Sequence, residues 1–187
     1  AVELAERLVA AGYYRDYGLP VAYTLTPDMV RLGKDCHIGH NVRIEGFTTI
    51  GDNVTIGDNT YIGENVSIGS DVMIGKNCIL KPGARIGTAP FFPYKDNVPC
   101  SFAGIGTVIL DDNVSVGVNT VIQRGTFSNT VVEQGTVIGD LVVIGHDVSL
   151  GEHCLIVSEA GISSRVTVEK YAKVLGSSCV AEGVHVG

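Results

Sequence analysis

The chain has 187 residues and carries 13 lysine and arginine residues against 20 aspartate and glutamate residues, a formal net charge of −7. This acidic balance argues against a surface for general nucleic-acid binding. The length suits one domain with one core, and 24 glycines with only 6 prolines are typical of a turn-rich β protein. The sequence shows no long apolar run and no signal peptide, so we expect a cytoplasmic protein without an integral membrane segment.

Residues 1–30 predict a short helix followed by a tyrosine-rich linker. Leu4, Leu8 and Ala11 share one face of the helix, and Gly12 is a natural C-terminal stop. The helix is either a docking element or a frayed tail. We interpret the tyrosines as a cover for the open end of the domain that follows, because terminal repeats need capping.

A strict six-residue repeat organises residues 31–187. From Leu32 to Ile86 every sixth residue is a large aliphatic, usually followed by glycine and preceded two places earlier by a small or β-branched residue. A period of six fits neither an amphipathic helix nor a two-sided strand. It predicts a three-sided β-solenoid, in which each hexad lays one strand and turns one corner while the aliphatic side chains stack inward. A sandwich of short strands, the alternative, would not keep this step.

The repeat is first interrupted by an insertion rich in proline and aromatic residues at 88–103. Insertions in solenoids map to loops on one face, which is often the binding face. We interpret Phe91, Phe92 and Tyr94 as one wall of a ligand cleft, with a packing lid as the alternative.

The second interruption is a four-residue offset around 124–129. The repeat then runs unbroken from Val132 to Val186. The offset predicts a bulged corner at Gln123 and Arg124, and bulges tend to mark functional sites. We therefore expect these two side chains to bind substrate.

Several motifs resemble the hexapeptide-repeat acyltransferase family, in particular the UDP-3-O-acylglucosamine N-acyltransferases and related nucleotide-sugar N-acyltransferases. They are Gly-Val-Asn-Thr-Val-Ile-Gln-Arg-Gly-Thr at 117–126, Leu-Val-Val-Ile-Gly-His-Asp-Val at 141–148, Leu-Gly-Glu-His-Cys-Leu-Ile at 150–156, and the aromatic insertion after Arg-Ile-Gly-Thr at 85–88. The Arg-Gly block followed by the Ile-Gly-His block is the more specific part of the resemblance.

The resemblance implies an all-β fold, a left-handed parallel β-helix, assembled as a homotrimer with sites between subunits. It implies transfer of an acyl group from acyl-CoA or acyl carrier protein to a nucleotide-linked amino sugar, as in lipid A or surface polysaccharide synthesis, with no bound cofactor and no metal. His146 matches the family's general base. An imidazole, with a pKa near 6.5, can accept the proton that the attacking amine loses.

The chain departs from the family pattern around this base. The family has an aspartate seven residues before it, where this chain has Gly139, so the orienting group is Asp140, a backbone carbonyl or a neighbouring subunit. The family's downstream histidine aligns on Gly183, and its Asp-Arg-Gly aspartate is Gln123. These departures favour a relative that uses acetyl or short acyl donors.

Two other hypotheses remain at this point. One is a non-catalytic β-helix that has lost the family's activity. The other is a zinc enzyme like the γ-class carbonic anhydrases, which needs three converging histidines. No two histidines of this chain are five residues apart, as the paired ligands of that class are.

Overall fold

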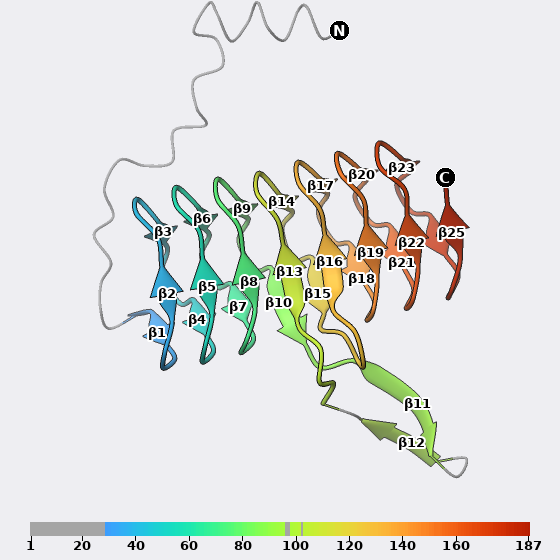
Figure 1. The fold of residues 1–187 in the computed structure, drawn as a ribbon, viewed down its shortest axis with the longest axis horizontal. Coiled ribbons are helices and arrows are strands. Elements are labelled where there is room, and N and C mark those ends of the chain that lie inside the picture. Colours follow the sequence, from blue (N-terminus) through green and yellow to red (C-terminus); the bar gives the residue numbers. More distant parts are fainter. Residues whose placement is uncertain (1–28, 96–97, 102) are drawn as a thin grey trace, which may run out of the picture.

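The computed structural model describes residues 29–95, 98–101 and 103–187. Within them the chain is a left-handed parallel β-helix, as the repeat and the resemblance predicted. The coils stack along one axis from the β1 end to the β25 end (Figure 1). The predicted N-terminal helix and the linker tyrosines lie outside the described residues.

Each regular coil lays three short strands, one in each of three parallel sheets, which we call faces 1, 2 and 3. Face 1 contains β1 (Arg31–Leu32), β4 (Thr49–Ile50), β7 (Ser67–Ile68), β10 (Arg85–Thr88), β15 (Val121–Gln123), β18 (Val143–Ile144), β21 (Gly161–Ile162) and β24 (Cys179–Val180). Face 2 contains β2 (His37–Ile38), β5 (Thr55–Ile56), β8 (Met73–Ile74), β13 (Val108–Leu110), β16 (Thr130–Val132), β19 (Ser149–Leu150), β22 (Thr167–Val168) and β25 (His185–Val186). Face 3 contains β3 (Arg43–Ile44), β6 (Tyr61–Ile62), β9 (Ile79–Leu80), β14 (Ser115–Val116), β17 (Val137–Ile138), β20 (Leu155–Ile156) and β23 (Lys173–Val174).

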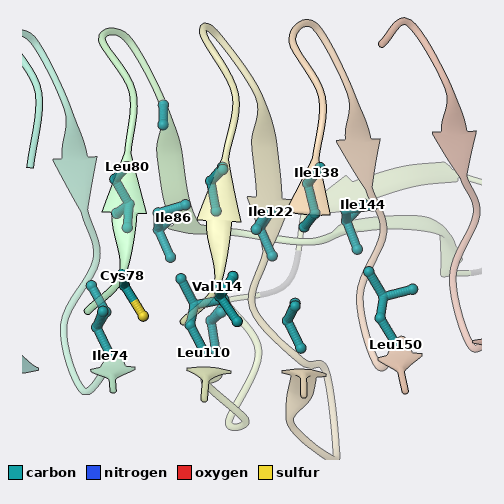
Figure 2. Close-up of a cluster of buried hydrophobic side chains, with 14 of the residues drawn as sticks. Ile74, Cys78, Leu80, Ile86, Leu110, Val114, Ile122, Ile138, Ile144 and Leu150 are labelled. Atoms are coloured by element: carbon teal, nitrogen blue, oxygen red, sulfur yellow. The ribbon is translucent and has the colours of Figure 1, made fainter. Parts of the chain in front are cut away.

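The repeated aliphatic residues form the core, as predicted. Figure 2 shows these side chains, Leu80, Ile122 and Ile138 among them, pointing into the coil from neighbouring strands. All three are at most 1% exposed. Burying each such side chain contributes roughly 1.5–3 kcal/mol. The buried stack runs from Ile44 to Val174, whereas Leu32 and Ile38 in the first coil are 52% and 37% exposed.

The corners explain the glycine and asparagine content of the repeat. A Cβ atom on Gly57 would lie 2.6 Å from the carbonyl carbon of Gly75 one coil away, so this corner position admits no side chain. Further into the corner the backbone turns left-handed, with φ of 58° at Asn53 and Asn59. Glycine, asparagine and aspartate adopt this conformation most readily.

Leu141 breaks this rule, because its backbone has a φ of 57° although leucine disfavours the left-handed conformation. Its side chain is 55% exposed, so little packing is lost on replacement. We expect Leu141→Asn to raise the free energy of unfolding by about 1 kcal/mol, measured from the urea midpoint at fixed protein concentration. The reverse change one coil earlier, Asn119→Leu at a φ of 54°, should lower it. Unchanged midpoints in both variants would contradict this account.

Both interruptions of the repeat lie at corners between face 1 and face 2, a row that we call the insertion edge. The antiparallel hairpin of β11 (Phe91–Lys95) and β12 (Val98–Ser101) leaves the coil after β10, projects from it and returns to β13 (Figure 1). The 124–129 loop follows one coil later, between β15 and β16. The two are tied together, since the Arg124 N–H donates to the Thr88 carbonyl at 3.0 Å.

Candidate active site

His146 stands on the insertion edge one coil after the 124–129 loop, at the corner between β18 and β19. Its side chain is only 7% exposed. His40, which also follows an Ile-Gly pair at a corner, has a side chain that is 96% exposed. His146 is therefore not an ordinary solvent-exposed corner residue, and the 124–129 loop accounts for the difference.

Two side chains hold the His146 ring through the same nitrogen. Nδ1 lies 2.7 Å from Oδ2 of Asp147 and 2.9 Å from Oγ1 of Thr126. Thr126 is 1% exposed and belongs to the four-residue offset. The offset thus brings a hydroxyl to a ring that a regular corner would leave in solvent.

The same loop wraps around the second carboxylate oxygen of Asp147. Oδ1 accepts the backbone N–H groups of Thr126 at 3.0 Å, Phe127 at 3.2 Å and Ser128 at 2.9 Å, together with the Ser128 hydroxyl at 2.8 Å. Burial alone raises the pKa of the Asp147 carboxyl, but the hydrogen bonds from His146, Ser128 and Phe127 outweigh it and hold this pKa well below its usual range. Asp147 is therefore ionised across the neutral range.

An ionised Asp147 determines the tautomer of His146. A carboxylate has no proton to donate, so at 2.7 Å Nδ1 must carry the hydrogen and donate it to Oδ2. The lone pair of a neutral His146 is then on Nε2. The ring is held in one orientation, with the basic nitrogen left for another group.

A groove of about 410 Å³ lies beside His146 on face 1. It extends from β18 across β21 to β24, toward the C-terminal end of the helix. His146 and Gln123 line it, together with Val143, Gly161, Cys179 and Glu182 and the corner residues Gly145, Ser163 and Ser164. A titratable side chain at the rim of a groove is the arrangement expected of a ligand or reaction site.

The structure brings Gln123 and His146 together in this groove but places Arg124 elsewhere. The Arg124 Nε donates to the Gly106 carbonyl at 2.8 Å, and Nη2 lies 3.6 Å from Asp71. Both contacts lie at the base of the hairpin, and Arg124 is not among the residues that line the groove. It fastens the insertion to the coil.

Asp140, one of the three orienting groups that the sequence left open, does not contact His146 within the chain. It lies at the preceding corner, between faces 3 and 1, where Oδ1 accepts the Val118 N–H at 2.7 Å and faces Nζ of Lys81 at 3.7 Å. One hexad separates two neighbouring corners, so side chains six residues apart sit on different edges. The carboxylate at the ring is that of Asp147.

Sequence reasoning therefore missed Asp147, Thr126 and Ser128. The available signal was that the Thr-Phe-Ser-Asn offset falls one coil before the Ile-Gly-His-Asp corner. Phe91, Phe92 and Tyr94 belong to β11, but their side chains lie outside the described residues, so their contact with a ligand stays a prediction. The hairpin does leave from the same edge as His146.

Two searches of the described residues complete the account of the site. No group of three or more histidine, cysteine, aspartate or glutamate side chains is placed to hold a metal ion. In the same part of the chain no helix has the length and apolar character needed to cross a bilayer.

Comparison with protein families gives three matches along the coil. The model described as bacterial transferase hexapeptide (six repeats) matches residues 29–58, 53–88 and 129–164, which together make up more than half of the chain. The chain belongs to this family. The hexapeptide-repeat assignment agrees with the fold, since the matched residues are those of the regular coils.

Curated relatives of this hexapeptide-repeat chain carry a consistent name. The chain is 42% identical over 110 residues to the UDP-3-O-acylglucosamine N-acyltransferase of Methylorubrum populi. The matched stretch covers 58% of this chain and 31% of that protein. The chain is also 45% identical over 89 residues to the UDP-3-O-acylglucosamine N-acyltransferase of Rhizobium meliloti, a match that covers 46% of this chain and 25% of that protein. The matched stretch is thus less than a third of the length of either relative.

Solved structures share the fold. LpxA from Acinetobacter baumannii superposes with a TM-score of 0.74 at 20% identity, covering 84% of this chain and 60% of that one. LpxA from Bacteroides fragilis, a UDP-N-acetylglucosamine acyltransferase, gives a TM-score of 0.60 at 26% identity, covering 88% of this chain and 67% of the other.

Proposed function

We propose that this chain is an N-acyltransferase. It transfers an acyl group from a thioester, acyl-CoA or acyl carrier protein, to the amine of a nucleotide-linked amino sugar, as in lipid A or surface polysaccharide synthesis. The observation that carries the proposal is the buried Asp147–His146 pair, which leaves Nε2 as the basic nitrogen of a residue that lines the groove. The names of the curated relatives support the class of donor and acceptor. Such a reaction belongs in the cytoplasm, where these donors occur, and requires no bound cofactor.

In the reaction the amine nitrogen attacks the thioester carbonyl carbon, forming a C–N bond. His146 Nε2 takes the proton that the nitrogen loses, and Asp147 stabilises the imidazolium through Nδ1. When the tetrahedral intermediate collapses, the C–S bond breaks and the thiolate leaves with the proton that His146 returns. The products are an amide and a free thiol, and no covalent enzyme intermediate is needed.

The developing oxyanion needs a hydrogen-bond donor beside His146. We assign this role to the backbone N–H of Ser164, which lines the same groove one coil later, because the Ser163 N–H already donates to the Val180 carbonyl at 3.0 Å. A Cβ atom on Gly145 would lie 2.8 Å from the Ser164 nitrogen, so glycine before His146 keeps that corner open. Gln123 lines the same groove, which supports the proposal that its side chain contacts substrate.

We further propose a homotrimer whose sites lie between subunits. On face 3 the outward side chains of Ile79, Val137 and Leu155 are 44%, 43% and 36% exposed, and Val137 pairs in register with Leu155. Apolar side chains gathered on a flat sheet are typical of a surface that contacts another protein. On face 1 Val143, at the rim of the groove, is 48% exposed, so a neighbouring subunit can supply the missing wall.

The direct test incubates the purified protein with acyl-CoA or acyl carrier protein donors and UDP- or dTDP-linked amino sugars, and follows release of the free thiol. Turnover that requires both substrates supports the proposal. Absence of thiol release across the panel would remove it. Sedimentation equilibrium of the same preparation should give three times the chain mass of 19.7 kDa, and a monomer would overturn the shared site.

A further inference from the structure

The second residue of a corner has a backbone N–H that a short side chain of the next coil often caps. Each described aspartate at this position of the following corner does so, at donor–acceptor distances of 2.6–2.8 Å: Asp52, Asp58, Asp112 and Asp140 accept from Lys34, His40, Lys76 and Val118. Two serine hydroxyls act in the same way, those of Ser70 and Ser158. Such an N–H therefore points along the axis toward the next coil, and an aspartate there occupies it.

The Ser164 N–H departs from this pattern. The corresponding side chain one coil later is that of Glu182, and among the described residues no acceptor takes this N–H. The neighbouring Ser163 N–H is paired, since it donates to the Val180 carbonyl at 3.0 Å. Ser164 and Glu182 both line the groove that contains His146. An uncapped donor is thus present where the thioester is proposed to react.

The length of Glu182 and its ion pair explain why the N–H is left uncapped. Oε1 of Glu182 lies 2.6 Å from Nη2 of Arg165, the residue after Ser164. Glu152, at a corner between faces 2 and 3, behaves alike, because in the described part of the chain the Gln134 N–H one coil earlier has no acceptor either. The extra methylene of glutamate carries the carboxylate away from the position that aspartate oxygens take.

The ion pair itself contributes little to the fold. The side chains of Arg165 and Glu182 are 62% and 53% exposed, and exposed pairs add little to stability. Its position matters more, because a lone carboxylate at the groove would repel the negative charge that develops on the thioester oxygen. Arg165 offsets that charge, and the Ser164 N–H remains available to the oxygen.

We propose that Glu182 is a positioning residue, which keeps the Ser164 N–H open to the thioester oxygen at a corner where aspartate would close it. This inference rests on the proposed function and adds a requirement to it. The side chain at position 182 must not cap the donor. A capped N–H would have to give up a hydrogen bond to a carboxylate, one of the stronger kinds, before it could bind the oxyanion.

The test is Glu182→Asp, where the most conservative change should be the most harmful. The shorter carboxylate caps the Ser164 N–H, and we expect kcat to fall about 10²–10³-fold, the usual effect of losing one oxyanion donor. The KM values should change little, because the oxyanion forms only in the transition state. Glu182→Gln and Glu182→Ala leave the N–H uncapped and should keep kcat close to that of wild type.

Glu152→Asp is the matched control, since it makes the same change at a corner outside the groove and should leave kcat unaltered. Melting temperatures should not fall in either aspartate variant, because each gains a hydrogen bond. Wild-type kcat in Glu182→Asp, or an equal loss in Glu182→Gln and Glu182→Ala, overturns the inference.

Amide hydrogen exchange tests the cap without turnover. In wild type the Ser164 amide should exchange much faster than the Val118 amide, which Asp140 caps at 2.7 Å. In Glu182→Asp the Ser164 amide should become protected, and an unprotected amide there overturns the inference. Protection with undiminished thiol release would reject the role of Glu182 and leave the proposed function standing. Protection in a protein that releases no thiol from any donor would instead remove the proposed function, and the role of Glu182 with it.

Discussion

Replacing His146 by alanine is expected to lower kcat by about 10²–10⁴-fold, the usual contribution of a general base. The attacking amine must lose a proton while the C–N bond forms, and Nε2 of His146 is the basic nitrogen that the groove offers. The substrate should still bind, because the groove is lined mainly by other residues. We therefore expect the loss in kcat rather than in KM, measured by thiol release under saturating donor and acceptor.

His40→Ala is the matched control for this variant. His40 also follows an Ile-Gly pair at a corner, but its side chain is 96% exposed and outside the groove, so its removal should leave kcat unchanged. His146→Gln adds a second test, since it retains a polar side chain at the corner but cannot act as a base. Wild-type rates in His146→Ala, or equal losses in the two alanine variants, would refute the assignment.

The pH dependence should distinguish the base from its partner. The pKa of Asp147 is held low, so this carboxylate stays ionised as the pH falls from neutral toward the range in which imidazoles gain a proton. The acid limb of a plot of kcat against pH should then fall with a slope of one proton. A slope of two protons on the acid limb would indicate that Asp147 is protonated together with the base.

The six-residue period was sufficient to predict the coil, because one physical requirement repeats along the chain. Each inward aliphatic must stack on its equivalent, so the phase of Leu32 also fixes that of Leu80 and the corners between them, and after the offset the phase of Val132 fixes that of Ile138. Burial confirms the core positions.

The site was only partly predictable, because it depends on local backbone geometry that a period does not encode. Asp147 is adjacent to His146, and adjacent residues of a strand point to opposite sides. At this corner the backbone of Asp147 is left-handed, with a φ of 57°, and its carboxylate contacts the ring instead. The 124–129 offset was visible in the sequence, but not the convergence of its N–H groups on Asp147.

Asp147→Asn is expected to lower kcat by about 10²–10⁴-fold, as far as removal of the base itself, by changing the tautomer of His146. The four donors of the 126–128 loop converge on Oδ1, so the amide oxygen must take that position. The amide NH₂ then faces Nδ1 and donates to it. Nδ1 becomes the acceptor, the proton moves to Nε2, and the basic lone pair no longer faces the groove.

The tautomer can be measured apart from activity, which separates this mechanism from simple loss of structure. The ¹⁵N shifts of the His146 ring should show the proton on Nδ1 in wild type and on Nε2 in Asp147→Asn, with the fold intact by melting temperature. Asp140→Asn removes the other candidate carboxylate, one corner away, and should leave both kcat and the ring shifts unchanged. If Asp140→Asn instead reproduces the loss while Asp147→Asn does not, a carboxylate from a neighbouring subunit orients the ring, and the pair seen within one chain is structural.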